Sequence, residues 1–312
     1  MSLLYADDEC LNKPINHARL NMHAVELFQP RAIVQATHII KPLLVSADIP
    51  IEAGELSLFS THPQTINLIT PNQQLITIHR YNSGLSPMGM MLKSSDFDDL
   101  LTFLLDGEIP LYQLPTGELQ IGLYLISLTT HVCQLTLKSH SLINKFDIAS
   151  LLKQINQPTG LFGELSNNLS GEYPPQLEML CCTMTNLMNG NADDITPFIG
   201  LGPGLTPSFD DIIVGMLAVI SGDHRFTSQM RQLKLAFEPL PLDLLTTKVS
   251  VNFLTYALQG KFSLLVLQVI KSFEKHKYHH SSIKNLLNYG HTSGSDLLLG
   301  IWLGIDRFVL RD

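Results

Sequence analysis

The segment from Gly200 to Asp211, GLGPGLTPSFDD, combines three glycines with hydroxyl and carboxyl side chains and leads directly into the apolar run 212–220. The start of a helix exposes unpaired backbone N–H groups and carries a partial positive charge. A glycine-rich loop at such a start can bring backbone N–H groups close to an anion. We therefore expect an anion-binding site that includes Gly202, Gly204, Thr206 and Ser208.

This loop matches neither of the common phosphate-binding motifs. No Gly-Lys-Ser/Thr follows the glycines, which excludes a P-loop, and the spacing excludes a dinucleotide fingerprint. The helix start itself has two solutions. Either Thr206 caps the helix with Pro207 at the first helical position, or Ser208 caps it and Asp211 closes a capping box. Both place Asp210 and Asp211 in the first turn, as candidate catalytic carboxylates.

Two further polar segments precede predicted helices. GHTSGSD (290–296) stands before the apolar run 297–305, and TTKVS (246–250) begins another helix. If these helix starts point at one pocket, their N-termini form a positive floor for phosphate or carboxylate. His291 is a candidate to move a proton there. The candidate ligand-binding residues of these two segments are Thr246, Thr247, Ser250, Thr292, Ser293 and Asp296.

The first half of the chain adds HRYNSGLSPMGM (79–90). His79 is a second candidate proton carrier, and Arg80 could pair with a carboxylate or phosphate. The alternative for Arg80 is an arginine exposed at the end of a strand. The aspartates of the helix starts could balance the positive floor or hold Mg²⁺, so Mg²⁺ is a candidate cofactor, although no residue is assigned as a metal ligand.

The periodicity of apolar residues predicts an α+β protein. Short alternating runs predict strands in the first half, including a hairpin that turns at Asn72 between 66–70 and 75–79. From about residue 145 the apolar residues recur at three and four positions, as in helices. We expect a mainly β domain (1–157), either barrel-like or an open antiparallel sheet, and a mainly α domain (158–312) with buried central helices. The helices predicted from residue 145 onward are 145–156, 175–189, 208–221, 243–259, 262–275, 282–287 and 295–308.

Composition narrows the class of protein. A net charge of -8 argues against nonspecific nucleic-acid binding, which needs a basic surface. The longest apolar runs are far shorter than the roughly 20 residues that span a bilayer, so no membrane partner is expected. The N-terminus lacks the basic start and apolar core of a signal peptide, and the four cysteines form no CxxC pair. These features favour a cytoplasmic protein with reduced thiols.

The polar segments resemble a known bacterial family. GLGPGLTPSFDD, LTTKVSVNFLTYALQGKF and YGHTSGSDLLLGIWLG occur in this order in the AllH family, and LITIHRYNSGLSPMGMML and GLFGEL are also similar to it. The resemblance covers roughly residues 56–303. It implies a subunit of oxamate carbamoyltransferase, a transferase that acts in anaerobic allantoin breakdown. This enzyme phosphorolyses oxalurate to carbamoyl phosphate and oxamate, so the resemblance also implies small anionic substrates and two companion subunits.

The resemblance leaves three alternatives for the chain itself. It is an enzyme subunit with its own pocket, a non-catalytic partner in the complex, or a protein that binds a small anion. In the first case the hydroxyls of Thr206, Ser208, Thr292 and Ser293 could stabilise the oxyanion of carbamoyl transfer. The sequence departs from the family at Phe209, where a glycine is common. If that position lines the pocket, Phe209 narrows it.

Overall fold

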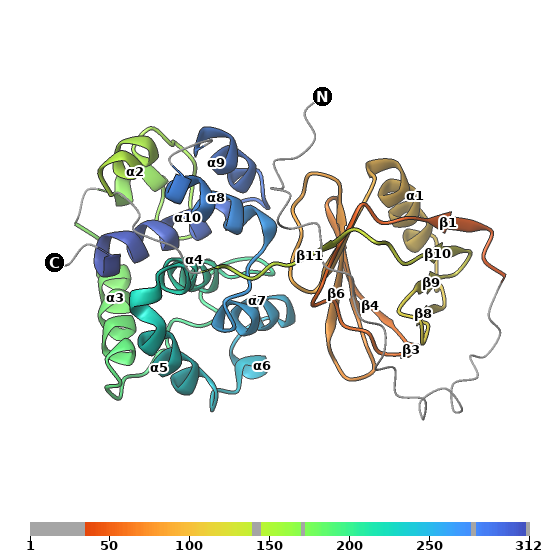
Figure 1. Cartoon of the computed structure of the whole chain (residues 1–312), viewed down its shortest axis with the longest axis horizontal. Helices are drawn as coiled ribbons and strands as arrows, with labels where there is room; N and C mark the ends of the chain where they lie inside the picture. The colour runs from red at the N-terminus through yellow and green to blue at the C-terminus, as the bar shows by residue number, and fades with distance from the viewer. Residues whose placement is uncertain (1–34, 139–144, 170–171, 276–278, 310–312) are drawn as a thin grey trace. The chain divides into compact units, whose positions relative to one another are not determined.

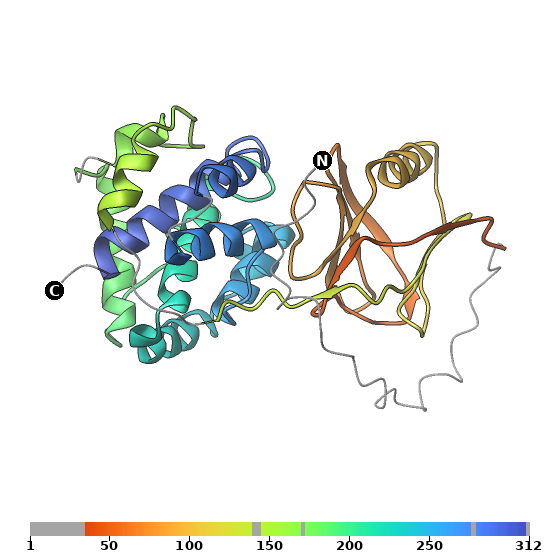
Figure 2. The same cartoon turned by 45° about the horizontal axis from the view of Figure 1, so that its top comes forward.

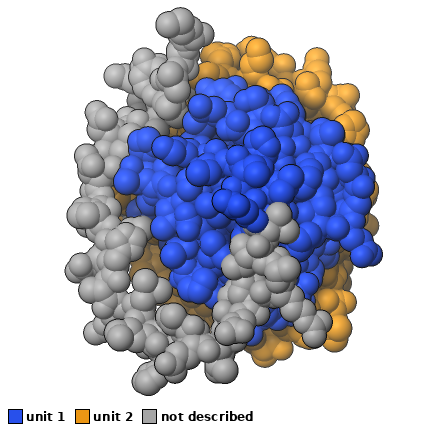
Figure 3. Space-filling view, turned by 90° about the vertical axis from the view of Figure 1, so that its right-hand side faces the viewer, with its two compact units in different colours: residues 1–135 blue, residues 136–312 orange. Residues whose placement is uncertain are grey.

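The computed structural model describes residues 35–138, 145–169, 172–275 and 279–309. The chain forms two compact units, unit 1 (residues 1–135) and unit 2 (residues 136–312), which Figure 3 distinguishes by colour. The described part of unit 1 contains strands and one helix, and that of unit 2 contains helices, so the predicted α+β class is confirmed. The predicted domain boundary near Pro158 lies inside unit 2.

The strands of unit 1 form two open sheets. Their bounds are β1 (His38–Ile40), β2 (Leu44–Ser46), β3 (Gly54–Glu55), β4 (Ser57–His62), β5 (Thr65–Ile69), β6 (Leu75–Arg80), β7 (Gly89–Leu92), β8 (Leu111–Gln113), β9 (Leu119–Ile121), β10 (Tyr124–Ile126) and β11 (Val132–Cys133). One sheet has the order β1-β10-β9-β8-β3 and the other β11-β2-β7-β6-β5-β4 (Figure 1). Within the described residues neither sheet closes into a barrel. The sheets are mixed rather than purely antiparallel, because β1 pairs with β10, β2 with β11 and β6 with β7 in parallel.

The predicted hairpin of unit 1 is confirmed. Strands β5 and β6 pair in antiparallel register from Thr65 opposite His79 to Ile69 opposite Leu75. The turn between them contains Asn72, and Gln73 takes a positive φ of 64° there. The helix α1 (Ser94–Leu105) follows β7. Its buried apolar residues belong to the same hydrophobic core as those of the strands of unit 1.

The helices of unit 2 surround a central one. Their bounds are α2 (Lys145–Leu152), α3 (Pro175–Met188), α4 (Ser208–Gly222), α5 (Thr227–Phe237), α6 (Leu242–Leu245), α7 (Lys248–Leu258), α8 (Leu264–Lys275), α9 (His279–Leu287) and α10 (Ser293–Gly304), with shorter turns η3 (Leu165–Asn168), η4 (His224–Phe226) and η5 (Ile305–Val309). Figures 1 and 2 show α4 inside this unit, where it packs against α10, α7, α5 and α8. The predicted burial of the two apolar helices is confirmed, since α4 and α10 are buried along nearly their whole length.

The observed helices differ from the predicted ones most clearly at three places. The helix predicted over 243–259 is two helices, because Thr246 is extended (φ -145°, ψ -178°) and Thr247 starts α7 by accepting a hydrogen bond from the N–H of Ser250 at 3.1 Å. Helix α10 is followed at Ile305 by the π-helical turn η5. Helix α5 was not predicted at all, although Met230, Leu233 and Phe237 form its buried face.

Helices α4 and α10 touch backbone to backbone. A Cβ built on Gly300 would overlap the carbonyl oxygen of Ile212, and one on Gly215 would lie 2.8 Å from the nitrogen of Ile301. Farther along both helices, a Cβ on Gly304 would lie 2.9 Å from the Cβ of Val219. The contact therefore advances along both helices in the same direction, and their N-termini lie at the same end.

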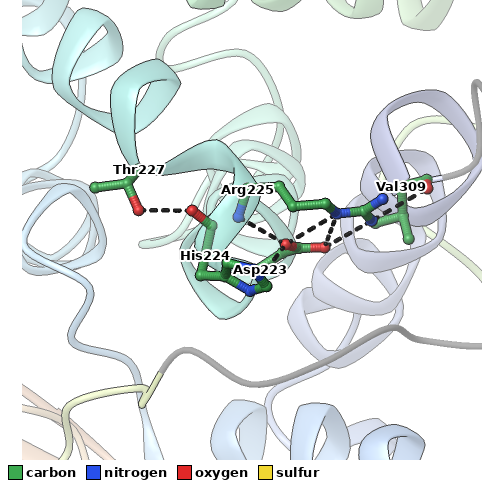
Figure 4. Close-up of polar contacts among 5 residues, drawn as sticks. All are labelled: Asp223, His224, Arg225, Thr227 and Val309. Atoms are coloured by element: carbon green, nitrogen blue, oxygen red, sulfur yellow. Dashed lines mark hydrogen bonds and ion pairs between the residues drawn. The ribbon is translucent and has the colours of Figure 1, made fainter.

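Arg225 links the segments that follow the C-terminal ends of these two helices (Figure 4). The carboxylate of Asp223, just after α4, accepts hydrogen bonds from Nη2 of Arg225 at 2.7 Å and from its backbone N–H at 2.9 Å. Nη2 of Arg225 also donates to the carbonyl of Val309, after α10, at 3.4 Å. In the described part of the chain, none of the helices has the length and apolar character needed to cross a membrane.

Candidate functional site

Asp210 connects the glycine-rich loop to the start of α7. Its Oδ1 accepts a hydrogen bond from the N–H of Gly200 at 2.8 Å. Its Oδ2 accepts hydrogen bonds from the hydroxyls of Thr246 at 2.5 Å and Ser250 at 2.6 Å. Burial raises the pKa of Asp210, and these hydrogen bonds oppose the rise. Both carboxyl oxygens are thus occupied within the protein, so Asp210 positions the loop.

Thr247 fixes a second point of the loop. Its hydroxyl donates to the carbonyl of Leu205 and accepts from the N–H of Ser250 at 3.1 Å. Gly202, with a φ of 126°, packs so tightly on the start of α4 that a Cβ there would lie 2.9 Å from Oγ of Ser208. The glycine at this position therefore serves a close approach of backbone to the helix start.

Neither predicted cap of α4 forms. The N-cap residue is Pro207, and no side chain caps the helix. The N–H of Phe209 instead donates to the carbonyl of Leu201 at 3.0 Å. The loop backbone satisfies this N–H group, so the hydroxyls of Thr206 and Ser208 do not cap α4. They lie instead near the start of α10, where they can form other hydrogen bonds.

Asp211 lies on one side of the contact between the two helix starts. The hydroxyls of Thr206 and Ser293 are 2.7 Å apart, and both lie close enough to the Asp211 carboxyl to favour its charged form. Burial nevertheless raises the pKa of Asp211 well above its usual range, and the charge of Asp296 adds to the rise. Tyr289 also lies near this carboxyl.

Asp296 lies on the other side of the same contact. Its two oxygens accept from the N–H of Gly160 at 3.1 and 3.2 Å. A Cβ on Gly160 would overlap Oγ of Ser208 and would lie 3.2 Å from Oγ1 of Thr292. Only a glycine leaves room for this backbone N–H to approach the carboxyl. Burial raises the pKa of Asp296 to about 6, and the Gly160 N–H opposes the rise.

Two further carboxyls of the site, those of Asp211 and Asp296, are buried near that of Asp210, whose charge also raises the pKa of Asp211. The helix N-termini and the nearby hydroxyls favour the charged carboxylates, whereas burial raises the pKa of both groups and the charge of Asp296 further raises that of Asp211. Because the charge of Asp296 raises the pKa of Asp211, the protonation of Asp211 depends on the charge of Asp296. With one proton between them, one carboxyl can donate a hydrogen bond while the other accepts one.

Two buried atoms of the site have no hydrogen-bond partner of good geometry among the described residues, although the Ser208 hydroxyl lies close enough to the Asp296 carboxyl to favour its charged form. They are Oγ of Ser208 and Oδ2 of Asp211, on side chains that are 1% and 4% exposed. An unpaired buried polar group costs about 1–3 kcal/mol, so proteins rarely leave one without a purpose. These atoms are the strongest sign that a ligand group completes the cluster.

The other predicted residues of unit 2 lie outside this cluster. His291 and Gly204 are exposed. The ring of Phe209 is fully buried and lies 5.5 Å from the ring of Phe162 and 5.6 Å from that of Phe198, measured between centroids. Phe209 thus belongs to an aromatic core next to the helix start.

The two candidates of unit 1 have partners within that unit. Arg80 forms a two-pronged pair with Asp98, with Nε at 2.8 Å and Nη2 at 2.9 Å from the carboxylate oxygens. His79 is buried, and its Nε2 accepts from the N–H of Ser86 at 3.1 Å and lies 2.9 Å from the Ser86 hydroxyl. Its Nδ1 is buried without a partner among the described residues. Burial lowers the pKa of His79 to about 3, so the ring is neutral at physiological pH.

The buried His79 gives unit 1 a pH-dependent stability. The pKa is about 3 in the folded chain and about 6.5 in the unfolded chain, so only the unfolded chain binds the proton between these values. The free energy of unfolding should therefore fall by up to about 1.4 kcal/mol for each pH unit below 6.5. The His79→Gln variant should lose this dependence in thermal unfolding between pH 7 and pH 5, while the exposed control His38→Gln keeps it. If stability changed with pH by the same amount in the wild type and in His79→Gln, this assignment would be contradicted.

Two residues of the site were not predicted from the sequence. Gly160 opens the GLFGEL segment, and Tyr289 directly precedes GHTSGSD, so proximity to the family segments was the available signal. A magnesium site gains no support: in the ranges that the structure describes, no three His, Cys, Asp or Glu side chains are grouped to hold a metal ion.

Comparison with known proteins bears on the half of the chain that contains the cluster. No solved structure matches the chain. A family model does match, and it covers the glycine-rich loop, α4, the start of α7 and α10. Residues 198–305 match the family described as oxamate carbamoyltransferase subunit AllH, which confirms over this range the family relationship that the motifs predicted.

Proposed function

We propose that the chain is a subunit of an oxamate carbamoyltransferase and that the cluster around Asp211 and Asp296 binds the reacting groups. The reaction transfers a carbamoyl group between carbamoyl phosphate and oxamate, in the direction of oxalurate phosphorolysis during allantoin breakdown. Two companion subunits complete the complex, which acts in the cytoplasm. The observation that carries the proposal is the pair of buried carboxyls with unpaired polar atoms, set among hydroxyls at two helix N-termini.

The proton balance of the reaction suits such a pair. A hydrogenphosphate oxygen attacks the carbamoyl carbon of oxalurate, and the bond from that carbon to the oxamate nitrogen breaks. The phosphate loses a proton and the departing nitrogen gains one, so no net proton is released. A charged Asp296 can accept the first proton while a protonated Asp211 donates the second. The hydroxyls of Thr206 and Ser293, together with the helix N-termini, favour the oxyanion formed in between.

The apolar surroundings of the cluster favour a second role, completion of a site shared with a companion subunit. Leu161 and Leu201, neighbours of Gly160 and Gly200, are 46% and 41% exposed, and Leu244 on α6 is 85% exposed. If these leucines form one contiguous patch beside the polar cluster, that patch is the kind of surface that a partner covers. The two roles are compatible, because the cluster could bind the reacting groups and also lie at the contact with a companion subunit.

An Asp296→Asn variant tests the catalytic role in the assembled complex. The variant keeps the shape of the side chain but cannot accept and release a proton, so kcat/KM for oxalurate phosphorolysis should fall about 100-fold. The measurement is the release of oxamate from oxalurate and phosphate. The matched control is Asp243→Asn, at a side chain that is 67% exposed and pairs with Lys248. Full activity of Asp296→Asn in a correctly assembled complex would overturn the role of the pair.

A further inference from the structure

One donor to Asp296 comes from outside the helices of the site. Residues 157–165 form a tight turn, and a backbone hydrogen bond of 2.9 Å joins its first and last residues. At the tip of this turn the N–H of Gly160 donates to both oxygens of Asp296, at 3.1 and 3.2 Å. Gly160 lies outside residues 198–305, which match the family model. The site therefore extends to a segment beyond the matched range.

Hydrogen bonds inside the turn hold this N–H group in place. The hydroxyl of Thr159 donates to the carbonyl of Gly163 at 2.9 Å and accepts from the N–H of Phe162 at 2.9 Å. The ring of Phe162 packs edge to face against that of Phe209 on α4, with 5.5 Å between the centroids. Because the turn is fixed within itself and against α4, its tip is preformed to present the N–H of Gly160.

The three buried carboxyls of the site differ in their donors. Asp210 accepts from one backbone N–H and two hydroxyls, and Asp296 accepts from one backbone N–H and lies near two hydroxyls. Asp211 also lies near two hydroxyls, which are hydrogen-bonded to each other. Among the described residues, no backbone N–H donates to the Asp211 carboxyl. The N–H of Gly160 is thus a donor that Asp296 has and Asp211 lacks.

The charged and titratable groups around the two carboxyls act mainly on Asp211. Asp211 faces Asp296, and Asp210, Tyr289 and Lys261 lie beyond it, the last two lining a small cavity together with Asp211. The charges of Asp296 and Asp210 both raise the pKa of Asp211. Burial raises the pKa of Asp296 to about 6, and the N–H at the tip of the turn is the first group that opposes the rise. Asp296 therefore ionises at a lower pH than Asp211.

We propose that Gly160 is a positioning residue for the reaction, whose backbone N–H holds the Asp296 carboxyl in its ionised form and so makes Asp296 the base. The inference rests on the proposed function, in which a charged Asp296 accepts the proton of the phosphate and a protonated Asp211 donates the other. Without this donor, Asp296 would keep its own proton to a higher pH, and fewer complexes would hold a base near neutral pH.

Three variants of the turn test the role of this N–H group. In Gly160→Ala the new Cβ would overlap Oγ of Ser208 and lie 3.1 Å from Oδ2 of Asp296. The turn must then withdraw or displace that hydroxyl, and either change weakens the donors to Asp296. Thr159→Val leaves Ser208 untouched and removes only the hydroxyl that fastens the turn. The matched control is Gly163→Asn, where a Cβ would meet nothing within 4 Å and the φ of 64° suits asparagine.

The first readout is the ionisation of Asp296 in the full chain, measured by thermal unfolding with and without Asp296→Asn at each pH. The folded-state pKa lies above the unfolded one, so the stabilising contribution of the carboxyl falls between about pH 4 and pH 6 and is constant above. In Gly160→Ala this fall should continue about one pH unit higher, and in Thr159→Val about half a unit higher. Gly163→Asn should follow the wild type. The influence of Asp211 is common to all these pairs.

The second readout is the pH dependence of kcat/KM for oxalurate phosphorolysis by the assembled complex. The midpoint of its acid limb should lie near pH 6 in the wild type and in Gly163→Asn, and about one pH unit higher in Gly160→Ala. A purely structural role of the turn would lower the rate at every pH without moving this midpoint.

Unfolding profiles of Gly160→Ala and Thr159→Val that match that of Gly163→Asn would overturn the proposal. If Gly160→Ala does not fold, Thr159→Val alone decides. The two readouts also separate this proposal from the proposed function. A shifted unfolding profile in a complex that transfers no carbamoyl group contradicts the function alone. An active wild-type complex whose variants show no shift contradicts the positioning role alone.

Discussion

Replacing Gly300 by alanine is expected to lower the free energy of unfolding of unit 2 by roughly 3 kcal/mol or more. The new Cβ would overlap the carbonyl oxygen of Ile212 and would lie 2.8 Å from its Cα. Backbone on the facing helix cannot move aside as a side chain can, so α4 and α10 must separate. The intrinsic preference of helices for alanine over glycine offsets only about 1 kcal/mol of this cost.

The measurement for Gly300→Ala is thermal unfolding of the chain, in which the midpoint should fall by roughly 6–12 °C. The matched control is Gly222→Ala at the end of α4, where the Cβ would lie 3.3 Å from a methyl carbon of Leu137 and 3.7 Å from one of Ile270. Those side chains can adjust, so the control should change the midpoint little. A Gly300→Ala protein as stable as this control would show that the helices do not need their close contact.

The close contact links the stability of unit 2 to the geometry of the candidate site. Gly215 and Gly300 each follow an aspartate by four residues, Asp211 on α4 and Asp296 on α10. Because the helices touch at these glycines and run in the same direction, one turn earlier their aspartates lie side by side. The arrangement that brings two carboxyls together is therefore a consequence of helix packing, and loops add the hydroxyls and N–H groups around them.

The sequence predicted the two buried helices of unit 2 better than it predicted the arrangement of the strands. The spacing of apolar residues identified α4 and α10 as buried, and the polar residues before them were recognised as unusual for simple caps. The periodicity of apolar residues could not predict that the starts of α4, α7 and α10 lie close together. That arrangement depends on which helix packs against which. The small residues that decide this, such as Gly160 and Gly300, have no side chain and thus little signal.

The differences between the predicted and the observed structure have physical causes. Neither predicted cap of α4 forms, because backbone carbonyls accept the N–H groups of the first turn: that of Leu201 accepts from Phe209, and that of Pro207 accepts from Asp210 and Asp211. In the missed helix α5, polar and basic residues interrupt the apolar ones, and only Met230, Leu233 and Phe237 of its eleven positions are buried. The parallel pairing of β6 with β7 depends on the intervening turn, which the pattern of alternation does not specify.

Asp211→Asn is expected to abolish most of the activity and to stabilise the chain. Phosphorolysis should fall about 1000-fold, because the amide cannot supply a proton to the departing nitrogen. The free energy of unfolding should rise by about 1 kcal/mol at pH 8, because the amide is neutral in the folded and the unfolded chain, whereas the carboxyl is ionised in the unfolded chain and its charged form is disfavoured by burial. The wild-type carboxyl has a raised pKa in the folded chain, so its stabilising contribution is complete below about pH 4 and is lost as the pH rises through the folded-state pKa. The variant should therefore lose less stability between pH 5 and pH 8.

The neighbouring Asp210→Asn variant separates a site residue from a structural one. Asp210 accepts hydrogen bonds from Gly200, Thr246 and Ser250, so an amide in its place leaves donors without acceptors and should lower the free energy of unfolding by about 1–3 kcal/mol. Opposite changes in stability from the same substitution at adjacent buried residues are expected only if Asp211 is kept for chemistry at the expense of stability. Asp211→Asn would contradict this interpretation if it lost stability as Asp210→Asn does, or if it retained wild-type turnover in the assembled complex. A gain in stability with a loss of activity would show that the buried pair exists for the reaction, because a fold that needed the pair would not improve without it.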